Sequence, residues 1–119
     1  MTGRRVLSDM TAQAYVHQAD LILAEGTDSA TVGAMVTVAL CGHWEHEGPC
    51  RWPHHNQIEG SQFRTVFIAT PEDEPEVRHR IRTALQRHPG WRVVSDADRA
   101  LAADEHELAA RLAQAPRRL

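Results

Sequence analysis

Between residues 63 and 95 an amphipathic segment is enclosed by two apolar ones, and this order constrains the fold more than any other feature. Residues 63–70 are rich in β-branched and aromatic side chains and end before Pro71, which predicts a strand. An acidic start at residues 73–76 then precedes apolar residues at helical spacing, which are Val77, Ile81, Ala84, Leu85 and His88. Pro89 and Gly90 end that helix, and residues 91–95 predict another short strand. A strand, a helix and a strand in this order predict a parallel pair with a right-handed crossover.

Three further segments have the spacing of regular structure. Residues 9–24 are expected to form a helix, because apolar side chains recur near helical spacing at Met10, Ala14, Tyr15, Ala19, Ile22 and Leu23. In residues 31–40 the clearly apolar side chains alternate with other residues, which predicts a strand. A last helix is expected from about Asp104 to before Pro116, lined by Leu101, Leu108 and Leu112.

Together these elements predict an α+β fold, in which a small three-stranded mixed sheet carries an N-terminal helix and a C-terminal helix. The strand at residues 31–40 can lie at an edge or between the other two strands, and we favour the latter, a split β-α-β arrangement. The α+β domain is expected to span residues 31–116, with a Cys/His-rich loop at 41–56. Residues 1–30 are then a helical extension, and residues 117–119 a frayed tail.

Composition limits the class of partner. A chain of 119 residues with 42% hydrophobic residues supports one domain with a modest core. The net charge of -3 makes nucleic acid an unlikely partner unless a basic patch forms locally. Arg78, His79 and Arg82 could form such a patch, but Glu74–Arg78 and Glu76–Arg80 have the i, i+4 spacing of ion pairs on a solvated face. The partner expected from the sequence is therefore an unidentified small molecule or protein, and the oligomeric state is left open.

The sequence also bears on location. Its apolar stretches are far shorter than the roughly 20 residues of a spanning helix, so no membrane association is expected. Polar residues follow the basic start too closely for a signal peptide, which predicts a cytoplasmic protein. All 13 basic residues are arginine, a bias typical of GC-rich genes that suggests a bacterial origin. In a reducing cytoplasm the two cysteines are expected to be thiols or metal ligands.

Residues 41–55 contain both cysteines and four of the eight histidines. Thiolate and imidazole are donors that zinc prefers, and copper or iron less commonly. Cys41 and His43 are two residues apart at the end of the predicted strand, so their side chains would point to the same face. Cys50 and His54 are four residues apart, so they would lie on one side of a helical turn. We expect zinc or another transition metal to be bound by Cys41, His43, Cys50 and His54, with His46 and His55 as substitutes.

Other interpretations of this segment remain open. The two cysteines match no common zinc-finger spacing, so the histidines could be polar loop residues beside buried thiols, or Cys41 and Cys50 could form a disulfide. Glu45 and Glu47 could act as general bases toward a metal-bound water, although the HExxH arrangement of metalloproteases is absent. Trp44 and Trp52 could cover the site or contact a ligand.

Three functions follow from these interpretations. We rank first a non-enzymatic, metal-binding α+β module with a binding or regulatory role. A small metal-dependent or thiol-based enzyme of hydrolase type, using Glu45, Glu47 or His46, is the second. A metal-free interaction protein is the third. Whether the protein is an enzyme is therefore open, and the sequence leans towards a protein that is not.

Overall fold

A computed structural model describes residues 11–41 and 51–114 of the chain. Four strands, three α-helices and a short 3-10 helix follow one another in these residues. Their order is β1 (Gln13–Leu23), α2 (Ala30–Cys41), β2 (His54–Glu59), β3 (Gln62–Ala69), α3 (Glu74–Arg87), β4 (Trp91–Arg99), η1 (Ala103–Glu105) and α4 (His106–Ala113).

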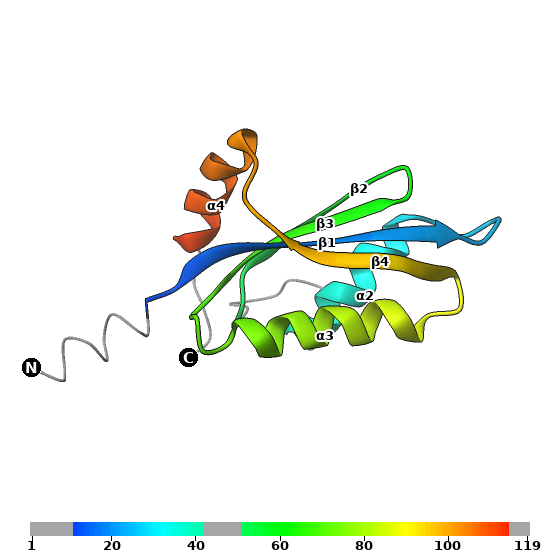
Figure 1. The fold of residues 1–119 in the computed structure, drawn as a ribbon, viewed down its shortest axis with the longest axis horizontal. Helices are drawn as coiled ribbons and strands as arrows, with labels where there is room; N and C mark the ends of the chain where they lie inside the picture. Colours follow the sequence, from blue (N-terminus) through cyan, green and yellow to red (C-terminus); the bar gives the residue numbers. More distant parts are fainter. Residues whose placement is uncertain (1–10, 42–50, 115–119) are drawn as a thin grey trace, which may run out of the picture.

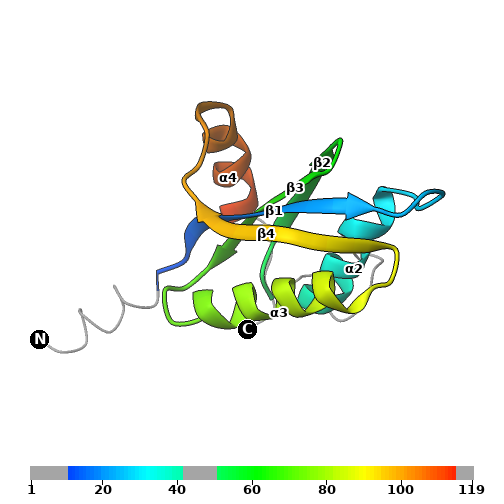
Figure 2. The same cartoon turned by 45° about the vertical axis from the view of Figure 1, so that its right-hand side comes forward.

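The four strands form one sheet in the order β2-β3-β1-β4, and every neighbouring pair is antiparallel. Helices α2 and α3 lie on one face of this sheet, and α4 lies on the other (Figures 1 and 2). The chain order β-α-β-β-α-β with this strand order is the ferredoxin-like arrangement. The α+β class is confirmed, whereas the expected three-stranded mixed sheet is wrong in strand number and direction. The strand between β3 and β4 is β1, not residues 31–40.

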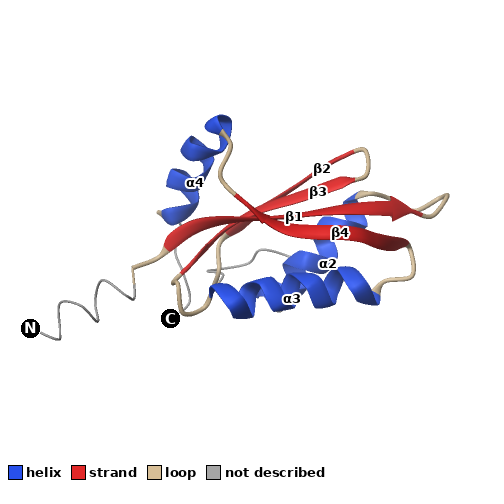
Figure 3. Ribbon diagram, viewed as in Figure 1, coloured by secondary structure: helices blue, strands red, loops and turns tan. Residues whose placement is uncertain are grey.

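The strand β1 is an interior strand of the sheet, so the predicted helix over residues 9–24 is wrong (Figure 3). Its two faces meet different layers. Ala19 and Leu21 pack in the core beneath α2 and α3, while Val16 packs in a second core beneath α4. A strand buried on both faces loses the simple alternation of apolar and polar residues, and its apolar residues then match helical spacing as well. Residues 13–23 thus belong to the sheet and do not form a helical extension.

The opposite error affects α2, because the strand predicted over residues 31–40 is a helix. Val32, Val36 and Leu40 recur every four residues and are all buried against the sheet. The Asp28 carboxylate accepts a hydrogen bond from the backbone N–H of Ala30 at 3.0 Å, which satisfies a donor at the start of the helix. Alternating valines favour a strand by propensity, and burial of one helical face overrides that preference.

The strand β2 differs from the sequence expectation, because it begins within the segment expected to be a Cys/His-rich loop at 41–56. It pairs with β3 alone and forms an edge of the sheet. The other elements are confirmed: β3 and α3 match the predicted segments to within one residue at their ends, β4 continues beyond the predicted 91–95, and α4 lies within the predicted last helix. The described residues contain no helix long and apolar enough to cross a membrane.

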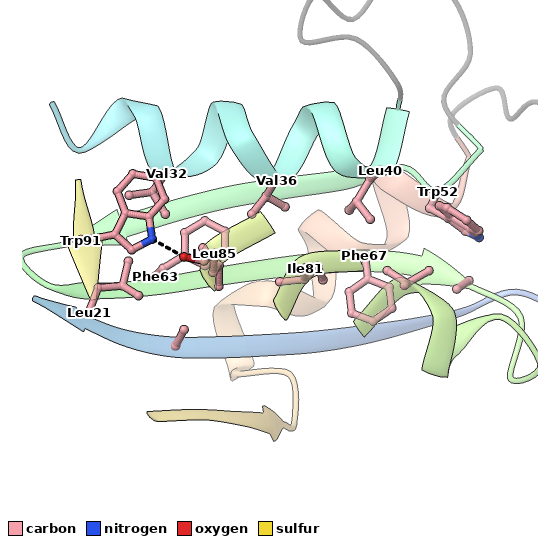
Figure 4. Packing of buried hydrophobic residues seen from close by; sticks show 13 residues of the cluster. Leu21, Val32, Val36, Leu40, Trp52, Phe63, Phe67, Ile81, Leu85 and Trp91 are labelled. Atoms are coloured by element: carbon pink, nitrogen blue, oxygen red, sulfur yellow. Dashed lines mark hydrogen bonds between the residues drawn. The ribbon is translucent and has the colours of Figure 1, made fainter. Parts of the chain in front are cut away.

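Two aromatic residues of β3, Phe63 and Phe67, lie at the centre of the main core, fully buried (Figure 4). Trp91, at the start of β4, closes one end of the core and donates from Nε1 to the carbonyl oxygen of Leu85 at 2.8 Å.

On the other face of the sheet, Arg64 donates to both carboxylate oxygens of Glu105, at 2.6 and 2.7 Å, and so ties the η1–α4 segment to β3. This bond lowers the pKa of Glu105, because it favours the charged carboxylate.

Leu21 and Ile22 provide a test of the β1 assignment. Leu21 is 2% exposed and Ile22 is 50% exposed. We expect Leu21→Ala to lower the free energy of unfolding by about 2–5 kcal/mol. The matched variant Ile22→Ala is expected to lower it by at most about 0.5 kcal/mol, as for other surface positions. Urea unfolding measures both. A helix over residues 9–24 buries Ile22 in place of Leu21, so the reverse order of losses would refute the strand.

Candidate functional site

The structure brings Cys41 and His54 together, although 13 residues separate them along the chain. Cys41 is the last residue of α2, and His54 is the first of β2. The distance between Cys41 Sγ and His54 Nδ1 is 4.0 Å. The other expected ligands His43, His46 and Cys50 lie outside the described residues, as do Trp44, Glu45 and Glu47.

His54 is buried, and both nitrogens of its ring have partners. Nδ1 lies 3.0 Å from the carbonyl oxygen of Trp52, and Nε2 lies 3.0 Å from the hydroxyl of Thr37. A carbonyl oxygen only accepts, so in this arrangement Nδ1 carries the proton and Nε2 accepts from Thr37. Asn56 completes the cluster by donating from Nδ2 to Thr37 Oγ1 at 3.1 Å and to the carbonyl oxygen of Gly33 at 3.0 Å.

Gly33 and Asn56 bring α2 close to β2. A Cβ atom added at Gly33 would lie 3.3 Å from the Cβ of Asn56, tighter than almost all such contacts. The absence of a side chain at residue 33 therefore allows the approach at which Asn56 reaches the helix backbone. This approach also carries Thr37 to the ring of His54.

Cys41 is half-buried and disulfide-bonded in the structure. A sulfur in a disulfide does not ionise, whereas a metal ligand must be a thiolate. The described geometry thus corresponds to the oxidised form of Cys41, and metal binding by this residue requires its reduction.

His55 is exposed, while its neighbour His54 is buried. Successive residues of a strand point to opposite faces, so His55 lies on the far side of β2 from Cys41. His55 thus does not share a face of β2 with His54, and its part as a substitute ligand stays a prediction.

Trp52 is 3% exposed and belongs to the main core, so it is not an exposed ligand contact. Its Nε1 donates to a carboxylate oxygen of Asp73 at 3.2 Å. The guanidinium carbons of Arg51 and Arg80 lie 4.8 and 4.9 Å from the ring centroid, a cation–π geometry. Trp52 thereby anchors the chain next to His54 and fixes the start of β2.

The spacing arguments from the sequence do not explain why Cys41 and His54 meet. Cys41 ends a helix, not a strand, so the same-face argument for residues 41 and 43 does not apply. Residues 51–53 are not helical and His54 begins a strand, so the helical-turn argument for residues 50 and 54 does not apply. Packing of α2 against the sheet brings the pair together. The hydrogen-bonding partners Thr37 and Asn56 were missed, because a predicted strand at 31–40 does not direct Thr37 towards residue 54.

A second buried polar cluster lies between β1, β4 and α3. His17 is fully buried, and Arg78 Nη1 lies 3.0 Å from its Nδ1. A guanidinium only donates, so His17 Nδ1 accepts and Nε2 carries the proton. Within the described residues Nε2 has no hydrogen-bond partner, and its nearest carboxylate oxygen, on Asp96, is 3.6 Å away.

Arg78 also pairs with Glu74 at 2.8 Å and with Asp98 at 3.2 Å. The predicted i, i+4 pairs Glu74–Arg78 and Glu76–Arg80 are both present. Arg78 is 5% exposed, however, and its Nη1 donates to the carbonyl oxygen of Val16. The expectation of a solvated face is therefore wrong for this residue. The sequence could not indicate that Arg78 is buried, because its partners on β1 were expected to lie in a helix.

Comparison with protein-family models, with curated proteins and with solved structures finds no match for the chain. The described residues contain no group of three or more histidine, cysteine, aspartate or glutamate side chains arranged to hold a metal ion. The candidate site thus rests on the pair Cys41 and His54 and on their surroundings.

The His17 cluster predicts how stability depends on pH. Burial lowers the pKa of His17, the charges of Arg78 and Arg82 lower it further, and Asp96 opposes them. The folded protein then binds fewer protons than the unfolded chain below the ordinary histidine pKa of 6.5. The free energy of unfolding should therefore fall as the pH drops from 6.5 through the folded-state pKa, with no contribution from His17 above 6.5.

Urea unfolding of wild type and His17→Gln between about pH 5 and pH 8 measures this effect. Glutamine can still accept a hydrogen bond from Arg78 but does not titrate, so the variant should lose less stability in acid. His55→Gln is the control, because His55 is exposed and has no part in the cluster. Equal acid sensitivity in wild type and His17→Gln would contradict the assignment.

Proposed function

We propose that the protein is a non-enzymatic α+β module that binds a zinc-type metal ion through its Cys/His-rich segment, with Cys41 and His54 as two of the ligands. Bound metal would tie the end of α2 to the start of β2 and organise the intervening chain for binding a small molecule or a protein. The observation that carries this proposal is the 4.0 Å separation of Cys41 Sγ and His54 Nδ1.

The distance suits two ligands of one ion. Zinc–sulfur and zinc–nitrogen bonds of about 2.3 and 2.0–2.1 Å at a tetrahedral angle put sulfur and nitrogen about 3.6 Å apart. A shift of a few tenths of an ångström would therefore bring Cys41 and His54 to this separation. The remaining ligands would come from His43, His46 and Cys50, in agreement with the sequence expectation.

Thr37 supports a metal-bound His54. Coordination through Nδ1 requires loss of the proton that Nδ1 donates to the carbonyl of Trp52, and the proton then resides on Nε2. A hydroxyl group accepts as readily as it donates, so Thr37 Oγ1 can keep its bond to Nε2 in both forms. A second hydrogen bond of this kind is how proteins orient histidine ligands. The cost is the hydrogen bond from Nδ1 to Trp52.

A binding role is favoured over hydrolysis because of how the two ligands are held. His54 is only 9% exposed and both of its ring nitrogens already have partners, Thr37 and the carbonyl of Trp52, so little of the ring is open to a substrate. A structural site also uses all four positions, whereas a catalytic zinc keeps one for water. Because thiolate ligands require reduced cysteines, the expectation of a cytoplasmic protein belongs with this proposal.

Metal content tests the proposal. Protein purified with a phosphine reductant is exchanged into zinc-containing buffer, and native mass spectrometry counts bound ions. We expect one zinc ion per chain. Cys41→Ser and His54→Gln should each weaken zinc binding at least ten-fold, since loss of a hydrogen-bond partner of a ligand alone costs roughly 10–100-fold, while His55→Gln should leave it unchanged. Thermal unfolding of each variant separates loss of a ligand from loss of the fold.

Cobalt(II) provides a second readout. The cobalt form of wild type should show thiolate-to-metal charge-transfer absorption, and Cys41→Ser should reduce its intensity. If the fully reduced protein binds neither zinc nor cobalt, the proposal is wrong. In that case the disulfide at Cys41 would hold the segment in place of a metal ion. The protein would then be the metal-free interaction protein that the sequence analysis ranks third.

A further inference from the structure

A pocket of about 330 Å³ lies between α2 and α3 and is lined by residues of both helices. We call it the α2–α3 pocket. Met35, Val38 and Ala39 line it from α2, and Thr83 and Ala84 line it from α3. It contains neither Cys41 nor His54, so an inference drawn from it is independent of the metal proposal.

The α2 wall of the pocket is unusual for an exposed helix, because α2 has no charged residue over its 12 positions. Val38 is 39% exposed, one of three large apolar side chains at the surface of the described residues. A helix on the surface of a globular protein normally carries charged residues on its outer face. The apolar wall therefore indicates a surface that an apolar group covers.

The rim of the pocket is basic. His79, Arg80 and Arg87 contribute to it, and no acidic residue among the described ones lines it. Arg80 already pairs with Glu76 at 2.8 Å and donates to the carbonyl oxygen of Ala39. Arg87 is exposed and makes no ion pair within the described residues. Arg87 is thus the cation available to a ligand.

We propose that the α2–α3 pocket binds a single-chain amphiphile with an anionic headgroup, whose carboxylate pairs with Arg87 while its hydrocarbon chain covers Met35, Val38 and Ala84. The volume is that of a small-molecule site, since such pockets span roughly 300–1,000 Å³. A protein interface needs a far larger surface, about 800 Å² on each partner. Charge complementarity selects an anion over a neutral or cationic amphiphile.

Dodecanoate is the probe, used below its micelle concentration with the full-length protein. Isothermal titration calorimetry gives the affinity, and backbone amide shifts in NMR spectra locate the site. We expect saturable one-to-one binding and shifts centred on Val38, Ala39 and Ala84. Dodecyltrimethylammonium has the same chain with the opposite charge, and it should bind at least ten-fold more weakly.

Two valines form a matched pair of variants. Val38→Glu introduces a carboxylate into the apolar wall and should reduce dodecanoate affinity at least ten-fold. Val94→Glu places the same charge at another exposed valine, 59% exposed on β4 and outside the pocket, and should leave the affinity unchanged. Arg87→Gln should reduce the affinity about five-fold, as expected for one exposed ion pair, and Arg92→Gln should not.

Four results would overturn the proposal. Dodecyltrimethylammonium could bind as tightly as dodecanoate, which would remove the role of charge. Dodecanoate could fail to bind, which would refute the site. Val38→Glu and Val94→Glu could also weaken binding equally, which would show that dodecanoate does not bind in the α2–α3 pocket. The protein could also be a dimer that Val38→Glu dissociates, in which case a second copy of the chain covers this surface.

Discussion

The fold depends on β1 pairing with a strand on each side. It aligns antiparallel with β3 along Gln13 to Asp20 and with β4 along Val16 to Leu23. Because the strand is interior, its backbone groups are satisfied on both edges and its side chains are buried towards both helical layers. Ala19 and Leu21 then support α2 and α3, and Val16 supports α4. Without β1 the other three strands would not form one sheet.

Two buried histidines illustrate how a hydrogen-bonding partner determines what an imidazole can do. Arg78 can only donate, so it restricts His17 to the tautomer with its proton on Nε2 and opposes protonation. Thr37 can donate or accept, so its bond to His54 fits either tautomer, and it is the carbonyl of Trp52 that holds the proton on Nδ1. His17 is consequently an element of acid sensitivity. His54 faces Cys41, and its bond to Thr37 is compatible with a proton on either ring nitrogen.

The candidate metal site and the α2–α3 pocket lie at the same end of α2. Arg80 connects them, because it borders the pocket, donates to Ala39 and stacks on Trp52, which precedes His54 by two residues. Arg80 thus lies beside both, although the two proposals are independent of one another and are tested separately.

The sequence by itself determined the elements whose signals are local. The helix α3 has acidic residues at its start, one apolar face and Pro89-Gly90 at its end, and β3 is a dense run of β-branched and aromatic residues. The concentration of donors in residues 41–55 likewise indicated where metal chemistry could occur. The signals for α3 and β3 persist in the structure because tertiary packing agrees there with local preference.

Only the tertiary structure determined that β1 and β2 are strands and that α2 is a helix. Burial of β1 on both faces removed the alternation by which a strand is identified, and burial of Val32, Val36 and Leu40 made a helix of a valine-rich segment. The same packing decided the partners within the Cys/His segment. It brought His54 to Cys41 and turned His55 away, since neighbouring residues of a strand face opposite sides of a sheet. Residue types are written in the sequence, but which of them meet depends on packing between distant segments.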